Sequence, residues 1–87
     1  SEEVRKMTEK MDIILKGFSE VLSFHDLRIV GRGQRENLVF DVVVKKGVTL
    51  KEEKILRQAI TEKVQQQHPF CNCVITFDQN DMLINEY

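Results

Sequence analysis

The 87-residue sequence contains no tryptophan, one proline, one tyrosine and two cysteines. A single pair of cysteines cannot form the dense disulfide framework of a small secreted domain. The charges of the 13 basic and 14 acidic residues nearly cancel. The net charge therefore does not indicate binding to nucleic acid or to an anionic membrane. Five phenylalanines and one tyrosine are too few, and too scattered, for the stacking surface of an RNA-binding sheet.

Long apolar runs are also missing. The longest are Leu38–Phe40 and Val42–Val44, separated by Asp41, whereas a membrane-spanning helix needs about 20 apolar residues. The first residues, Ser-Glu-Glu, are not those of a signal peptide. We therefore expect a single domain, residues 1–87, with a small core.

Hydrophobic periodicity predicts two helices and three strands. Apolar residues recur at three- and four-residue spacing in the helical segments and alternate with polar ones in the strands. In chain order, the predicted elements are helix 4–22, strand 25–31, strand 37–46, helix 49–67 and strand 71–78.

Both predicted helices show apolar stripes. Met7 and Met11 in the first helix are expected in the core or on a partner. Thr49 and Glu52 form a capping-box pattern at the start of the second helix, and Pro69 prevents its continuation. We expect this helix to bury the following side chains: Leu50, Ile55, Leu56, Ala59, Ile60 and Val64.

The order α-β-β-α-β predicts an α+β, ferredoxin-like two-layer sandwich with a three-stranded mixed sheet. The first two strands form an antiparallel hairpin, and the strand–helix–strand return makes the last two parallel. Both helices then cover one face of the sheet. The other face is left partly apolar, at Val30, Val39, Val43 and Val74, which favours a homodimer.

The run His25-Asp26-Leu27-Arg28 opens the first predicted strand, directly after the first helix. Together with the order of the other elements, it resembles the cytosolic C-terminal domain of the cation diffusion facilitator (cation efflux) transporters, over about residues 4–80. The resemblance implies a dimerisation and regulatory domain on the cytoplasmic side of the cell membrane. Its partners would be a second copy and the transmembrane part of the same transporter; Ser1 is interpreted as the start of a fragment.

The resemblance also implies a metal site. In zinc-binding members the ligands are the His of this motif, a His midway along the second strand, often a His early in the second helix, and a His-x-Asp/Glu-Pro pattern ending the third strand. The corresponding positions here are His25, Asp41, a position near Lys54, Phe77, Gln79 and Asn80. We expect His25, Asp41 and Gln79 to bind zinc or another divalent cation weakly, without any need for it in folding.

Alternatives remain for each of these groups. Asp41 is either a ligand or a carboxylate neutralised by a base such as Arg28. Cys71 and Cys73 are either core residues or, with His68, thiolate and imidazole ligands.

We expect no enzymatic activity, because the sequence pairs no nucleophile with a base and has no phosphate-binding loop. The alternative functions are a free-standing metal-binding or metal-chaperone protein of the same fold, and a scaffold without a metal role.

Overall fold

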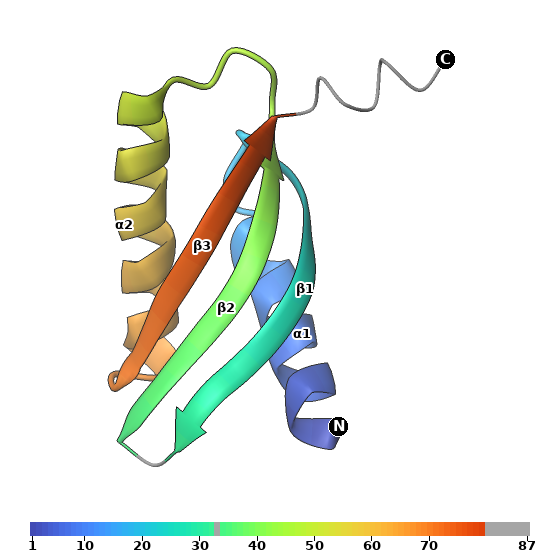
Figure 1. Ribbon diagram of the computed structural model, residues 1–87, viewed down its shortest axis with the longest axis vertical. Helices are drawn as coiled ribbons and strands as arrows, with labels where there is room; N and C mark the ends of the chain where they lie inside the picture. Colours follow the sequence, from blue (N-terminus) through green and yellow to red (C-terminus); the bar gives the residue numbers. More distant parts are fainter. Residues whose placement is uncertain (33, 80–87) are drawn as a thin grey trace.

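The computed structural model describes residues 1–32 and 34–79, which form two helices and three strands (Figure 1). None of the helices in this part of the chain is long and apolar enough to cross a membrane. The elements are α1 (Glu2–Leu15), β1 (Val21–Arg32), β2 (Arg35–Val44), α2 (Leu50–Gln67) and β3 (Cys71–Gln79).

The three strands form one mixed sheet in the order β1-β2-β3. β1 and β2 are antiparallel, whereas β2 and β3 are parallel, as the sequence predicted. Figure 1 shows both helices behind one face of this sheet, with α2 nearer β3 and α1 nearer β1. The predicted two-layer α-β-β-α-β fold is confirmed.

The core lies between the helices and β2. Every second side chain of this strand is buried, which is the period-2 pattern of a strand covered on one face. Each such burial contributes about 1.5–3 kcal/mol of hydrophobic stabilisation. The buried core residues are Met11, Leu15, Leu38, Phe40, Val42, Val44, Leu56, Ile60, Val64, Cys71, Cys73 and Ile75.

The first helix is shorter than predicted. It ends at Leu15, and the prediction of helix up to residue 22 was wrong. Beyond it the backbone N–H of Gly17 donates to Ile14 O at 3.1 Å and that of Phe18 to Leu15 O at 3.1 Å, so the chain tightens into three-residue turns. The strand then begins at Val21, four residues before its predicted start.

Two β-bulges explain this error. Register shifts fall between Val21 and Ser23 and between His25 and Arg28, and each inserts an extra residue into β1. As a result Val21, Phe24 and Leu27, spaced three apart, all pack against the core. A spacing of three is also the spacing of one helix face, so the bulged strand imitates a helical period.

The second helix begins as predicted. Glu52 N–H donates to Thr49 Oγ1 at 3.1 Å, and Thr49 N–H donates to Glu52 Oε1 at 3.0 Å, completing the capping box. Leu50 and Ile55, however, are 83% and 62% exposed, so their predicted burial was wrong. The buried stripe repeats every four residues from Leu56, and a helix turns about 100° per residue, so neither side chain lies on it.

The methionines of α1 belong to the core of the single chain. Met11 is fully buried, and Met7 is partly buried against the same cluster. Of the two alternatives for these side chains, core or partner, the structure places Met11 in the core.

Candidate functional site on the open face of the sheet

The sheet face opposite the helices, called here the open face, is covered by no element of the described part of the chain (Figure 1). The strand registers place its side chains in rows that run across all three strands. From the hairpin end, the rows are Val30–Asn37–Asn72, Arg28–Val39–Val74, His25–Asp41–Thr76 and Ser23–Val43–Asp78.

His25 and Asp41 are direct cross-strand partners. Side chains at such positions start about 4.5–5.5 Å apart, so an imidazole and a carboxylate there can reach a common ligand. His25 is exposed and Asp41 is half-buried. The Nε2 atom of His25 lies 2.9 Å from Ser23 Oγ, which holds the ring on the open face.

Arg28 shares this face but does not neutralise Asp41. Among residues 1–32 and 34–79, the ion pairs join Arg5 to Glu2 and Glu9, and Lys16 to Asp12, in α1 and its C-cap. The carboxylate of Asp41 can therefore accept hydrogen bonds from, or bind, a group outside the described part of the chain.

Asp26, the second residue of the sequence motif, has a backbone role. It has φ +58°, in the left-handed region, at the bulge between His25 and Arg28. Aspartate tolerates this conformation better than most residues other than glycine. Asp26 and Leu27 together stand opposite Phe40, which returns Leu27 to the core and Arg28 to the open face.

The structure does not bring Gln79 to His25 and Asp41. Gln79 is the register partner of Val44, on the opposite face from Asp41. Its Oε1 accepts from Gly47 N–H at 3.0 Å, and its Nε2 donates to Val48 O at 2.9 Å. The side chain thus fastens the loop between β2 and α2.

Two open-face residues were missed at the end of β3. A His-x-acid pattern places both donors on one side of a strand, and the side shared with Asp41 is that of Thr76 and Asp78. Phe77 lies on the covered face, packed against the core. Thr76 and Asp78, and not Phe77 and Gln79, therefore share the open face with His25 and Asp41. The alternation of covered and open-face residues along β3 is the sequence pattern that could have identified Thr76 and Asp78.

The alternative ligands are poorly suited to a cation. Cys71 and Cys73 are both buried on the covered face. Burial, reinforced by Glu36, raises the pKa of the Cys71 thiol, and burial raises the pKa of Cys73 to about 11. Both thiols are thus protonated near neutral pH, whereas metals bind the thiolate. His68 caps the end of α2, with Nε2 at 3.5 Å from Lys10 Nζ.

The described part of one chain does not complete a metal site. Within the described ranges, no group of three or more His, Cys, Asp or Glu side chains could hold a metal ion. The open face offers one imidazole, from His25, and the carboxylates of Asp41 and Asp78, where a closed zinc site takes roughly four donors. These residues fit a divalent cation only if further ligands come from beyond the described residues of one chain.

The fold and this face define a class of protein. Residues 4–80 match the family described as the cytoplasmic domain of cation efflux proteins. The match spans most of the chain, which therefore belongs to this family, a transporter domain on the cytoplasmic side of the membrane. No curated protein sequence matches the chain closely.

Solved structures show the same fold. The zinc form of the zinc transporter CzrB superposes with a TM-score of 0.78 at 24% identity, covering 92% of this chain and 88% of that one. The metal-bound C-terminal domain of the CzcD transporter from Thermotoga maritima gives a TM-score of 0.75 at 19% identity, covering 85% and 87%. At these identities the likeness extends to the fold alone.

Proposed function

We propose that residues 1–87 form the homodimerising, regulatory domain of a divalent-cation efflux transporter, joined to a membrane part and without enzymatic activity. The observation that carries this proposal is the open face, where apolar side chains surround the His25–Asp41 pair. Val30 and Val74 on this face are 51% and 48% exposed. A domain this small gains from covering such a patch, and a second copy is the simplest cover.

The charges of the open face suit a two-fold contact. Arg28 is exposed near the hairpin end, and Asp78 is exposed near the other end, each without an ion pair in the described ranges. A face-to-face two-fold pair in which the strands of the two copies cross would bring Arg28 of one copy toward Asp78 of the other. Opposite charges at these positions favour that pairing and its register.

The metal role follows from the same arrangement. CzrB was solved in a zinc form and CzcD with metal bound, which supports a divalent cation as the ligand of this face. Here His25, Asp41 and Asp78 of each copy would supply ligands to a cation between two chains. Binding would be weak, and it would bias the separation of the two domains and so the transporter above them.

Sedimentation of the metal-stripped chain tests the pairing. We expect a dimer at high micromolar concentration, and a monomer when Val74→Asp places a charge in the apolar patch. Leu50→Asp is the matched control, because Leu50 is the more exposed apolar residue but lies on α2. A monomeric wild type, or a dimer broken by Leu50→Asp and kept by Val74→Asp, would refute pairing through the open face.

A further inference from the structure

The tip of the β1–β2 hairpin carries two arginines that have no carboxylate partner among the described residues. Arg32 and Arg35 are direct cross-strand partners, and both are exposed. Like charges in this arrangement destabilise a hairpin. The ion pairs of the described chain do not include either arginine. The nearest acid along β2, Glu36, is the partner of Cys71 on the opposite face.

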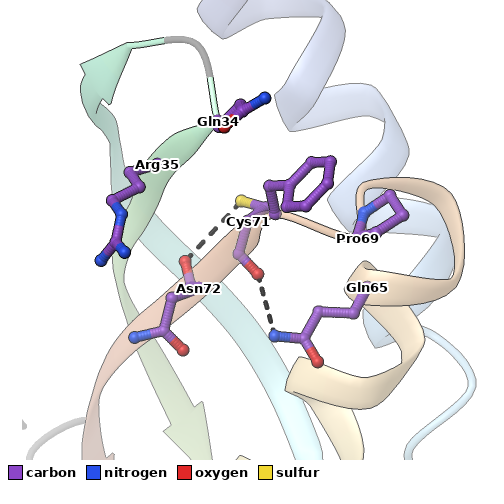
Figure 2. A pocket seen from close by; sticks show the side chains of 7 residues that line it. Gln34, Arg35, Gln65, Pro69, Cys71 and Asn72 are labelled. Atoms are coloured by element: carbon purple, nitrogen blue, oxygen red, sulfur yellow. Dashed lines mark hydrogen bonds between the residues drawn. The ribbon is translucent and has the colours of Figure 1, made fainter.

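An exposed aromatic ring stands next to this pair. Phe70, in the turn between α2 and β3, is 67% exposed. It lines one shallow hollow together with Arg35, Gln34, Pro69 and Asn72 (Figure 2). Arg35 and Phe70 thus line one hollow, with the Arg35 side chain pointing away from Pro69 (Figure 2).

Both features lie at one end of an elongated molecule. The domain measures 43 Å along its longest axis, and Figure 1 shows the hairpin tip and the turn before β3 together at one end of that axis. The N-terminus lies toward the same end (Figure 1). A partner that approaches along this axis meets the hairpin tip with Arg32 and Arg35 first, and then the start of α1 and the turn before β3 (Figure 1).

We propose that this end of the domain docks on the surface of an anionic phospholipid bilayer. Guanidinium groups bind phosphate oxygens in a bidentate manner, so Arg32 and Arg35 would hold the lipid headgroups. The ring of Phe70 would enter the interfacial layer, where apolar and aromatic groups of surface-bound segments lie. The balanced overall charge of the chain does not oppose this, because a contact of this size depends on the local pair.

The proposal rests on the proposed function, because a domain joined to a membrane part is held beside the bilayer. Under that tether even a weak contact is populated, since the effective concentration of lipid is high. The other end of the domain carries Lys51 and Lys54 at the start of α2, with Glu52 and Glu53 between them, and serves as the comparison in the experiment.

Vesicle flotation at low ionic strength tests the docking surface. The 87-residue chain should float with vesicles of equal parts phosphatidylcholine and phosphatidylglycerol, and not with phosphatidylcholine alone. Arg32→Gln and Arg35→Gln should each weaken the apparent affinity about fivefold. Phe70→Ser should weaken it as well. The control Lys51→Gln/Lys54→Gln removes two charges from the other end, as many as Arg32→Gln/Arg35→Gln removes from the tip, and should leave flotation unchanged.

Three results would overturn the proposal: no flotation with anionic vesicles, equal flotation with neutral ones, or equal loss in the lysine control. Binding of a polyglutamate peptide that Arg32→Gln/Arg35→Gln abolishes, without flotation of the wild type, would assign the tip to an acidic protein instead. Sedimentation of the same variants separates this outcome from the proposed function. The arginine variant should remain a dimer, because Arg32 and Arg35 lie at the hairpin tip, beyond the valines of the open face.

Discussion

The guanidinium group of Arg57 lies over the ring of Phe77, with 5.0 Å between Cζ and the ring centroid. The same side chain donates a hydrogen bond from Nη2 to Ile75 O at 3.2 Å. One arginine of α2 therefore binds both the backbone and a side chain of β3. Phe77, which the sequence marked as the place of a lost metal ligand, is instead part of this contact on the covered face.

Replacing Arg57 should loosen α2 from β3. We expect Arg57→Ala to lower the free energy of unfolding by about 1–2 kcal/mol, because it removes a cation–π contact and a charged hydrogen bond. Urea denaturation measures the change. Lys54→Ala, less than one turn earlier on the helix, is the control. It should change the free energy of unfolding by at most about 0.5 kcal/mol, the usual range for exposed sites. Equal effects of the two variants would mean that the Arg57 contacts add nothing.

The capping box gives a prediction for the start of α2. Thr49→Ala should cost about 1 kcal/mol of stability, because Glu52 N–H loses its acceptor. Chemical denaturation of the variant measures this cost. Thr49→Ser, which keeps the hydroxyl, is the control and should remain close to the wild type. A loss within measurement error in Thr49→Ala would mean that the cap is not formed in solution.

Glu52 adds a pH dependence. The backbone N–H of Thr49, and then its hydroxyl, hold the pKa of this carboxyl below its ordinary value of 4.5. A lowered pKa in the folded state means that the stabilisation is complete above pH 4.5 and is lost as the pH falls through the folded pKa. Denaturation curves from pH 6 to about pH 3 should therefore show a shallower loss in Glu52→Ala than in the wild type. Parallel curves would contradict this role of Glu52.

The order of the elements, the strand directions and the cap could all be predicted, because each leaves a local or periodic signal in the sequence. The end of α1 could not, since two bulges gave Val21, Phe24 and Leu27 the spacing of a helix face. His25 and Asp41 could be placed together, because hairpin partners follow from the register. The role of Gln79 could not be predicted, since it depends on a loop that begins more than 30 residues earlier.

The bulge residue of the His-Asp-Leu-Arg motif can be tested directly. Asp26 has φ +58°, so Asp26→Ala should cost about 1 kcal/mol of stability, whereas Asp26→Gly should be neutral or stabilising. Thermal or urea unfolding of both variants measures the difference. If alanine is tolerated as well as glycine, the residue does not hold the left-handed conformation, and the bulge does not explain the aspartate of the motif.

Gln79 should act on stability and leave metal binding unchanged. Its amide bonds Gly47 N–H and Val48 O, so Gln79→Ala should destabilise the domain by about 1–2 kcal/mol. Gln79→Glu keeps an acceptor for Gly47 and loses the donor to Val48, and should lie between the alanine variant and the wild type. A zinc affinity that falls in Gln79→Ala while stability is unchanged would instead make Gln79 a ligand, as the sequence suggested.

Zinc binding itself should be weak and should depend on the open face. His25, Asp41 and Asp78 give each chain one imidazole and two carboxylates, and no three such groups meet in the described part of one chain. We therefore expect affinity in the micromolar range or weaker, roughly −8 kcal/mol or less favourable. Calorimetric titration should show a further loss in His25→Ala, in Asp41→Asn and, to a smaller extent, in Asp78→Asn.

The control for this titration is Glu3→Gln, which removes an exposed carboxylate from α1 and should leave zinc binding as it was. Nanomolar binding by the wild type would show that ligands were missed, and Cys71→Ser, Cys73→Ser and His68→Ala would then find them. Weak binding that survives His25→Ala and Asp41→Asn together would mean that the open face holds no cation. In that event the domain would pair through its apolar and charged side chains alone, because Val30, Val74, Arg28 and Asp78 remain in place without the metal.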